Sequence, residues 1–289
     1  DLVHCNHFFL MPIARRLSHG TVPILLDTHD LQARQFALIN ETMPWLSPRA
    51  TYESMLAREL EAMRGADLLL HLNAQEAETF GALLPEKAHA LLYPAVPEAP
   101  TGPGGPDIIL VASNNAANVE SVIWFLREVA PKTRGVTVKI VGNVDAAIRS
   151  QAPDQYAAYK HWFLGRVDDP RAVYANARIA LLPTVSGTGL SIKSVEALSS
   201  GLPLIATAQA MRGMDEEALR LPGVVIADSA EDFADALSQA LACAPLDDSA
   251  RRVSPARRYY EARFSLSAYK ANLGVLTSAL INAGAVNRA

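Results

Sequence analysis

The sequence has few cysteines and no grouping of metal-ligating residues. Only two of its 289 residues are cysteines, Cys5 and Cys243, and they lie far apart along the chain. This usage fits a reduced compartment, so we expect a cytoplasmic protein. The sequence also contains no Asp-x-Asp pair and no cluster of histidines and cysteines with metal-ligand spacing. We therefore expect no metal site.

Runs of basic residues and long apolar segments are missing as well. The formal net charge is −4 and no basic tract occurs, which argues against nucleic acid as a main partner. No apolar run reaches the roughly 18 residues that a membrane span needs. No signal peptide is visible at the start of the sequence. These absences agree with a cytoplasmic location.

The chain does contain a regular alternation of apolar strands and helical patterns, in two blocks. Apolar residues make up 50% of the sequence, and 289 residues are enough for two domains. Residues 94–106 are dense in proline and glycine and are predicted to form a linker or hinge. We therefore predict one domain over residues 1–93, a second over 107–245, and a tail of helices over 246–289 that can pack back on the first domain.

Both blocks are predicted to be parallel sheets covered by helices on both faces. Strands are expected at residues 2–4, 22–27, 67–72, 89–93, 108–112, 136–141, 161–164, 179–183, 202–206 and 224–227. Ligands bind such sheets at the carboxyl ends of the strands, and the natural site in a two-domain protein is the cleft between the domains. The chain opens directly on a strand, so we expect the first domain to be incomplete. A solvated helix face is expected for the arginines of the tail, which are Arg251, Arg252, Arg257, Arg258 and Arg263.

Residues 186–207, SGTGLSIKSVEALSSGLPLIAT, are predicted to form a glycine-rich loop, a helix over 190–200 and a buried strand. Gly187 and Gly189 flank Thr188 and allow the backbone to approach a ligand closely. A loop of this kind before a helix presents free N–H groups that suit a phosphate. Tight packing alone is the alternative explanation for these glycines.

Charged side chains near the ends of predicted strands are further candidates for a site. Lys193 and Glu196 lie three residues apart in the helix after the glycine loop, where they either face the same crevice or form a surface salt bridge. His29 follows a buried strand and is either directed at a ligand or satisfied by a backbone carbonyl. Arg166 also follows a strand, and its alternatives are to cap a helix or to pair with a neighbouring aspartate.

Several segments occur in the order of a known family. In the second block, ILVASNNAANVESVIWFLREVAP is followed by FLGRVDD, YANARIALLPT and GTGLSIKSVEALSSGLPLIAT. In the first block, DLVHCNH, VPILLDTHD and RGADLLLHLNAQEAETF also fit. With these segments nearly the whole chain resembles the GT-B glycosyltransferases, and it is closest to the large retaining family 4. The resemblance implies two Rossmann-like α/β domains that face each other across a cleft, with the first domain incomplete.

The resemblance implies a donor site in the second domain. Glu196 corresponds to the second glutamate of the family's Glu-x7-Glu pair, which hydrogen-bonds the ribose hydroxyls of the donor. Thr188 stands where the first glutamate is expected, so a hydroxyl or another group must take over its contact to the donor sugar. Gly189 and Leu190 would offer backbone N–H groups to the phosphate, beside Gly187.

The positive charge that neutralises the diphosphate is expected to come from positions other than those that the family uses. The family uses an arginine and a lysine near the start of the second domain, but residues 113–118 contain neither. Arg166 and Lys193 are the nearest candidates to replace them. Val167 matches the backbone position that contacts the base, and His29 matches the histidine that points at the donor sugar. His29, Lys193 and Arg166 are therefore the predicted catalytic residues.

The resemblance implies a retaining glycosyltransferase that works without a metal or another cofactor. Its donor would be a nucleotide diphosphate sugar and its acceptor a saccharide or a lipid-linked molecule, in cell-surface polysaccharide or glycolipid synthesis. Peripheral association with the inner face of the membrane would fit that setting, although no basic amphipathic helix is evident. Two alternatives stay open: a nucleotide-sugar epimerase of the same fold, and a non-catalytic protein that binds a nucleotide or a partner.

Overall fold

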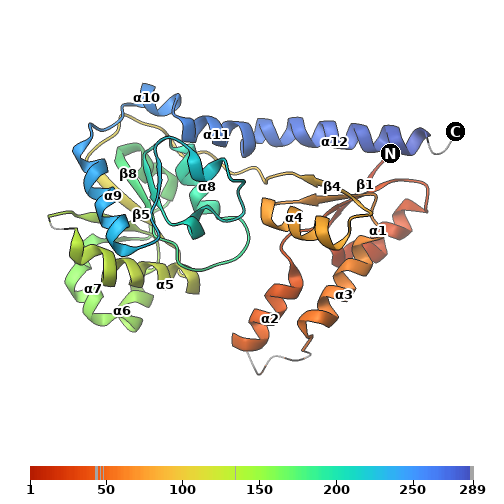
Figure 1. Ribbon diagram of the computed structural model, residues 1–289, viewed down its shortest axis with the longest axis horizontal. Helices are drawn as coiled ribbons and strands as arrows, with labels where there is room; N and C mark the ends of the chain where they lie inside the picture. Colours follow the sequence, from red (N-terminus) through yellow and green to blue (C-terminus); the bar gives the residue numbers. More distant parts are fainter. Residues whose placement is uncertain (43–44, 46, 48, 134, 287–289) are drawn as a thin grey trace. The chain divides into compact units, whose positions relative to one another are not determined.

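The computed structural model describes residues 1–42, 45, 47, 49–133 and 135–286. The chain forms two compact units (Figure 1), of which the first holds Asp1–Pro94 and Ser267–Ala289 and the second holds Ala95–Leu266. Each unit is built on a parallel sheet with helices around it, which confirms the predicted α/β class. No described helix is long and apolar enough to cross a membrane.

The first unit has a four-stranded sheet in the order β1-β2-β3-β4. Its strands are β1 (Val3–Asn6), β2 (Ile24–Asp27), β3 (Leu68–His71) and β4 (Ala88–Leu91). Its helices are η1 (Phe8–Leu10), α1 (Met11–Ser18), α2 (Gln32–Thr42), α3 (Tyr52–Met63), α4 (Ala74–Leu83) and α12 (Leu266–Val286). The strand predicted at residues 2–4 continues to Asn6, because Asn6 pairs in register with Asp27 of β2.

The two faces of this sheet carry separate apolar cores, since successive side chains of a strand point to opposite faces. One face packs against η1, α1, α3 and α4, through a cluster that includes Phe8, Met11, Leu26, Met55, Met63, Leu69 and Phe80. The other face presents Leu25, Leu68, Leu70 and Leu92 to α12, whose Tyr269, Leu273, Leu276 and Leu280 pack against them. The last described helix of the chain thus covers one side of the first unit.

The second unit has a six-stranded sheet in the order β10-β9-β8-β5-β6-β7. Its strands are β5 (Asp107–Val111), β6 (Val138–Val141), β7 (Phe163–Gly165), β8 (Ala177–Leu182), β9 (Leu204–Ala206) and β10 (Val224–Ile226). All neighbouring strands are parallel. The strand order changes direction between β5 and β8, and open sheets of this kind bind ligands beyond the carboxyl ends of the strands at such a point.

Helical segments surround this second sheet. They are α5 (Ala116–Trp124), η2 (Phe125–Val129), η3 (Ala130–Lys132), α6 (Asp145–Gln151), α7 (Pro153–Tyr159), η4 (Lys160–Trp162), η5 (Pro170–Asn176), α8 (Ile192–Ser199), η6 (Ala208–Met211), η7 (Ala218–Arg220), α9 (Ala230–Ala242), α10 (Asp248–Arg252) and α11 (Pro255–Arg263). Several begin at a side-chain cap: Asn115 Oδ1 accepts from the N–H of Asn118 at the start of α5, and Ser229 Oγ accepts from the N–H of Asp232 at the start of α9.

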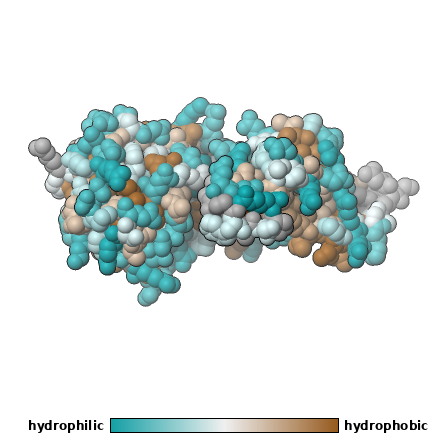
Figure 2. All heavy atoms as spheres, turned by 90° about the horizontal axis from the view of Figure 1, so that it is seen from below, coloured by the Kyte–Doolittle hydropathy of each residue, from teal (hydrophilic) through white to brown (hydrophobic). Residues whose placement is uncertain are grey.

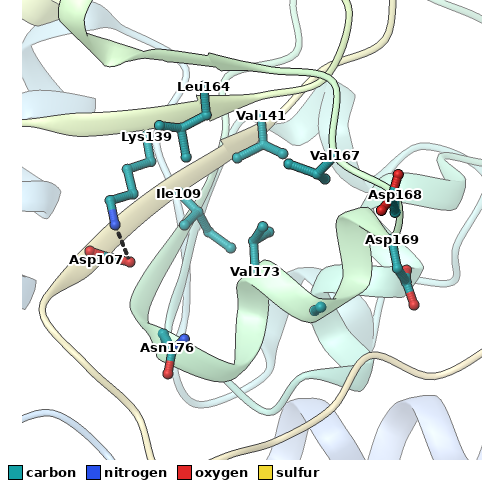
Figure 3. A pocket seen from close by; sticks show the side chains of 11 residues that line it. Asp107, Ile109, Lys139, Val141, Leu164, Val167, Asp168, Asp169, Val173 and Asn176 are labelled. Carbon is teal, nitrogen blue, oxygen red and sulfur yellow. Dashed lines mark hydrogen bonds and ion pairs between the residues drawn. The ribbon is translucent and has the colours of Figure 1, made fainter.

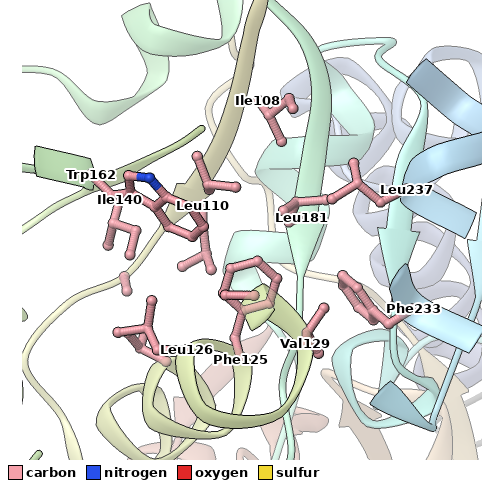
Figure 4. Close-up of a cluster of buried hydrophobic side chains, with 14 of the residues drawn as sticks. Ile108, Leu110, Phe125, Leu126, Val129, Ile140, Trp162, Leu181, Phe233 and Leu237 are labelled. Atoms are coloured by element: carbon pink, nitrogen blue, oxygen red, sulfur yellow. The ribbon is translucent and has the colours of Figure 1, made fainter. Parts of the chain in front are cut away.

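One apolar cluster fills the space between the second sheet, η2 and α9 (Figure 4). It includes Ile108, Leu110, Phe125, Leu126, Val129, Ile140, Trp162, Leu181, Phe233 and Leu237. Phe125 and Phe233 meet edge to face, with ring centroids 6.0 Å apart. Burial of each large apolar side chain contributes about 1.5–3 kcal/mol, so this cluster holds the strands that carry the functional loops in place.

The segment predicted as a hinge, residues 94–106, belongs to the second unit from Ala95 onward. Its backbone is held by that unit: the N–H of Ala99 donates to Ser199 Oγ at 2.8 Å, and the N–H of Gly104 donates to the carbonyl of Ala175 at 3.1 Å. Proline and glycine content predicted irregular structure correctly but could not reveal these tertiary contacts. The predicted tail over 246–289 is likewise divided, since its first part, with α10 and α11, lies in the second unit.

Arg251 corrects the prediction of a solvated arginine face in the tail, because its side chain is fully buried. Its guanidinium donates to the carbonyls of Ser200 at 3.0 Å and Tyr174 at 2.9 Å, and also to those of Ala175 and Pro100. Burial lowers its pKa to about 10. The Ser200 carbonyl lies at the carboxyl end of α8, so Arg251 satisfies a helix end that would otherwise lack a donor.

Candidate functional site

The glycine loop connects β8 to α8, at the carboxyl ends of the central strands of the second sheet. The predicted helix over 190–200 and strand over 202–206 correspond to α8 and β9. Gly187 has φ +123° and Gly189 has φ +65°, a region that favours glycine, so the loop can turn twice around Thr188. Gly187 and Thr188 are exposed and Leu190 is half-buried. Backbone groups of the loop are therefore accessible to a ligand.

Lys193 on α8 reaches the loop that follows β5. Its Nζ donates to Ser113 Oγ at 3.1 Å. Burial lowers the pKa of the Lys193 ammonium, the Glu196 carboxylate raises it, and the positive charge of Arg212 lowers it. Lys193 thus places a positive charge beside Ser113, in the region where the sequence itself offers no arginine or lysine.

Glu196 lies one turn further along α8, near several charged groups. Burial raises the pKa of its carboxyl group, while the positive charges of Lys193 and Arg171 lower it and Asp169 raises it. Among the described residues, no ion pair joins Glu196 to Lys193. The alternative prediction of a surface salt bridge between them is therefore not observed. The Glu196 carboxylate is half-buried and can accept hydrogen bonds from a ligand.

Two arginines near Glu196 and the glycine loop were not singled out from the sequence. Arg171 in η5 holds Asp169 with two hydrogen bonds, at 2.9 and 3.0 Å, and its positive charge also acts on Glu196. Arg212 follows η6 and donates from Nε to the carbonyl of Thr188 at 3.2 Å. Arg166 is exposed after β7, and its role at the phosphates remains a prediction.

Sequence signals for these two arginines differ. Asp169 and Pro170 before Arg171 form a helix-start pattern, since Asp169 Oδ1 accepts from the N–H of Arg171, so a careful reading of capping could have placed Arg171 beside the FLGRVDD motif. Arg212 has no such signal, because its contact with Thr188 spans 24 residues and depends on the path of the chain through β9.

A cavity of about 400 Å³ lies beside this region, between the β5–β6–β7 part of the sheet and η5 (Figure 3). Its apolar lining is formed by Ile109, Val141, Leu164, Val167 and Val173. Asp168 and Asp169 lie at one end, and at the other end Lys139 Nζ pairs with Asp107 Oδ2 at 2.6 Å. Val167, the residue predicted to contact the base, therefore lies at the boundary between this cavity and the strand ends.

In the first unit, three polar residues meet at the carboxyl ends of β1 and β2. Asn6 Oδ1 accepts a hydrogen bond from His29 Nε2, and the His7 ring stacks on that of His29 at 5.4 Å. His7 and His29 have φ of +80° and +57°, which is uncommon for residues other than glycine. Backbone conformations of this kind cluster at functional sites. The observed partner of His29 is thus a side chain rather than the backbone carbonyl of the alternative prediction.

Other histidines of the first unit have structural partners. His71 is fully buried, accepts or donates at Thr28 Oγ1 and His89, and packs on Phe80. Burial and the nearby His89 lower its pKa to about 4, so the imidazole is neutral near pH 7. The described residues contain no group of three or more histidines, cysteines or acids arranged to hold a metal ion.

Comparison with known proteins relates the second unit to one family. Residues 105–243 match the sequence model of the family described as glycosyl transferases group 1. No curated protein matches the sequence.

Solved structures match over almost the whole chain. HepE from Anabaena in complex with UDP has a TM-score of 0.67 and 15% identity, over 96% of this chain and 79% of that chain. Sucrose-phosphate synthase from Thermosynechococcus elongatus has a TM-score of 0.62 and 18% identity, over 98% and 74% of the two chains. Trehalose 6-phosphate synthase from Burkholderia multivorans has a TM-score of 0.64 and 12% identity, over 100% and 72%. At such identities these matches establish the fold. The chain therefore has the GT-B fold, and residues 105–243 in its second unit match the family described as glycosyl transferases group 1.

Proposed function

We propose that the chain transfers a sugar from a nucleotide diphosphate sugar to an acceptor, and that the second unit binds the donor. The observation that carries this proposal is the grouping of Lys193, Glu196 and the exposed glycine loop at the carboxyl ends of β5 and β8. A positive charge, an acceptor carboxylate and accessible backbone N–H groups are the groups that a nucleotide diphosphate requires.

Each group has a distinct role in this proposal. Glu196 accepts hydrogen bonds from the ribose hydroxyls, and Lys193 neutralises the diphosphate as it leaves. Gly189 and Leu190 donate backbone N–H groups to the phosphate. The Thr188 hydroxyl lies beside them on the same loop and is the candidate contact to the donor sugar in place of an acid. Arg171 adds a second positive charge next to Glu196.

We further propose that the sugar is transferred with retention of its anomeric configuration and without a metal ion. His29 is proposed to contact the donor sugar, and its ring is held in place for that role because Nε2 donates to Asn6 Oδ1. The second unit supplies the leaving diphosphate with cationic and N–H groups, which is the stabilisation that a departing phosphate needs. The proposed donor base is uracil, because solved neighbours include HepE with UDP and with UDP-glucose and a UDP-forming trehalose-phosphate synthase.

The proposed acceptor is a saccharide or a lipid-linked molecule. The proposed setting is cell-surface polysaccharide or glycolipid synthesis at the inner face of the membrane. Support comes from an apolar surface on η1 and α1, where Phe9, Leu10, Ile13 and Leu17 are 52%, 47%, 57% and 62% exposed, next to the exposed Arg16. This exposed apolar face, which the sequence pattern did not reveal, can insert at a membrane interface. The face shown in Figure 2 is mostly hydrophilic, with scattered apolar areas.

Titration with nucleotides tests the donor site. We expect UDP to bind the wild-type protein, and Lys193→Ala and Glu196→Ala each to weaken UDP binding by about 10-fold or more, as the loss of a hydrogen bond to a charged group predicts. Lys160→Ala in the exposed η4 segment is the matched control and should leave UDP binding unchanged. Failure of the wild-type protein to bind UDP, GDP or ADP would refute the proposal.

A nucleotide-binding protein without catalysis is the second candidate, favoured by one observation: Thr188 occupies the place of an expected acid. Assays of hydrolysis and transfer with a panel of UDP-sugars and acceptors separate the two candidates. UDP binding combined with turnover of any donor supports the transferase, whereas UDP binding without turnover of any donor supports the second candidate.

Sedimentation with vesicles tests the membrane part separately. The protein is expected to sediment with vesicles that contain phosphatidylglycerol, and Ile13→Ser with Leu17→Ser should abolish this. Val253→Ser, which changes an apolar residue 57% exposed in the second unit, is the control. If the double variant of Ile13 and Leu17 sediments with the vesicles as well as the Val253→Ser control does, the proposed role of α1 is contradicted.

A further inference from the structure

Two side chains from one segment hold consecutive carbonyls of the glycine loop. Gln209 in η6 donates from Nε2 to the carbonyl of Gly187 at 2.7 Å, and Arg212 donates from Nε to the carbonyl of Thr188 at 3.2 Å. Arg212 Nη1 also donates to the backbone carbonyl of Gln209 at 3.2 Å, which ties the Arg212 side chain to the backbone that carries Gln209. The two peptide groups that flank Thr188 are therefore both oriented from the η6 side.

The orientation of these carbonyls decides where the N–H groups of the loop point. In a trans peptide the carbonyl of one residue and the N–H of the next point in opposite directions. Because the carbonyls of Gly187 and Thr188 are directed at η6, the N–H groups of Thr188 and Gly189 are directed away from it. Within the described part of the chain, no hydrogen bond uses either of these two N–H groups.

Close packing accompanies this arrangement. A Cβ atom on Gly187 would lie 2.9 Å from Arg212 Nη2, so only glycine lets the guanidinium come this near to the loop. Arg212 also acts on Lys193, whose pKa its positive charge lowers. The guanidinium and the Lys193 ammonium are thus close enough to add their potentials at the loop.

The η6 segment is itself fixed to the sheet and to α8. Thr207 Oγ1 donates to the carbonyl of Thr184 at 2.5 Å and accepts from the N–H of Ala210 at 3.1 Å. Ser194 Oγ in α8 donates to the carbonyl of Ala210 at 2.5 Å. Gln209 and Arg212 therefore project from a backbone that is held at two points, by Thr184 and by Ser194, and they can transmit that rigidity to the glycine loop.

We propose that Gln209 and Arg212 are positioning residues that hold the glycine loop in a form whose Thr188 and Gly189 N–H groups bind the diphosphate of the donor. This inference rests on the proposed function, since it concerns the same phosphate site. Two N–H groups that point to one side form a concave anion site. Donation from a guanidinium to the Thr188 carbonyl also polarises that peptide group and strengthens its N–H as a donor.

Comparison of UDP with uridine tests the inference, because uridine has the base and ribose but no phosphate. Arg212→Ala and Gln209→Ala are expected to weaken UDP binding by about 10-fold to 100-fold and to leave uridine binding within about two-fold. Arg212→Gln keeps a donor for the Thr188 carbonyl without the charge and should recover part of the UDP affinity. Arg220→Ala, which removes an exposed arginine paired with Glu216, is the control for net charge.

The outcomes separate the inference from the proposed function. If the wild-type protein binds no UDP, the proposed function fails and the inference fails with it. If the wild-type protein binds UDP and the Gln209 and Arg212 variants bind it equally well, only the inference fails. Equal losses for UDP and uridine would also overturn it, because a general structural defect does not distinguish ligands by their phosphates. Thermal unfolding of each variant confirms that the second unit is folded.

Discussion

Replacement of Arg251 is expected to destabilise the second unit more than any other change to an arginine of the tail. The Arg251 guanidinium has no exposed surface and donates to four backbone carbonyls, from η5, the end of α8 and the segment before β5. In Arg251→Ala the carbonyls of Ser200 and Pro100 lose the only donor found for them in the described part of the chain, whereas those of Tyr174 and Ala175 keep the backbone N–H groups of Ala177 and Gly104.

The magnitude follows from the two carbonyls that lose their only described donor, those of Ser200 at 3.0 Å and Pro100 at 3.4 Å from the guanidinium nitrogens. A buried polar group left without a partner costs about 1–3 kcal/mol, so two cost about 2–6 kcal/mol. Removal of the buried charge offsets part of this cost, as the lowered pKa of Arg251 indicates. We expect Arg251→Ala to lower the free energy of unfolding by about 3 kcal/mol.

Urea unfolding followed by tryptophan fluorescence measures this change in the right unit. Two of the three tryptophans, Trp124 and Trp162, lie in the core of the second unit, whereas Trp45 is 76% exposed and should respond weakly. With a slope of about 1–3 kcal/mol per molar urea, the midpoint should fall by about 1–3 M.

Two further variants make the result decisive. Arg252→Ala removes the next arginine of α10, which is exposed and paired with Asp248, and should cost under about 1 kcal/mol. Arg251→Met fills the space of the side chain without donors and should remain destabilised. If Arg251→Met is as stable as the wild-type protein, the carbonyl contacts contribute nothing and the reasoning is wrong.

Three other predictions concern protonation and orientation. Burial raises the pKa of Glu196, so the affinity for UDP should fall as the pH drops through that raised pKa. Glu196→Gln should lose this pH dependence. If the affinity of Glu196→Gln for UDP depends on pH as that of the wild-type protein does, the proposed ribose contact is contradicted. Burial raises the pKa of Glu76 to about 7, above its value in the unfolded chain. Protonated Glu76 therefore contributes its full stabilisation of the first unit below about pH 4.5, and this contribution should be lost as the pH rises through about 7. Glu76→Gln should flatten that part of the melting-temperature profile, and a profile identical to that of the wild-type protein would count against it. Asn6→Ala should release the His29 tautomer, visible as a change in its imidazole ¹⁵N shifts, whereas unchanged shifts would show that Asn6 does not set it.

The fold and its family resemblance could be predicted from local patterns, because strands such as β2 and β9 are continuous apolar runs between turn residues. The order of motifs around Gly187 and Glu196 predicted the GT-B fold correctly. The glycine loop, α8 and β9 were placed to within a few residues.

Contacts between distant segments could not be predicted in the same way. Arg251 and Arg252 are identical neighbours in the sequence, yet one is buried and the other exposed, because only the tertiary path of the chain decides which of them meets α8. Arg212 was missed for the same reason. The positive φ of His7 and His29 could not be predicted either, since neither is glycine.

The covering of the first sheet by α12 has a consequence for how the protein is made. The apolar face formed by Leu25, Leu68, Leu70 and Leu92 is synthesised early, but its cover is encoded after the entire second unit. A nascent chain therefore carries that face without its native partner while the residues of the second unit, Ala95–Leu266, are translated. The second unit, whose elements are continuous in the sequence, can fold during that interval. The first unit is then completed only after α12 has been synthesised.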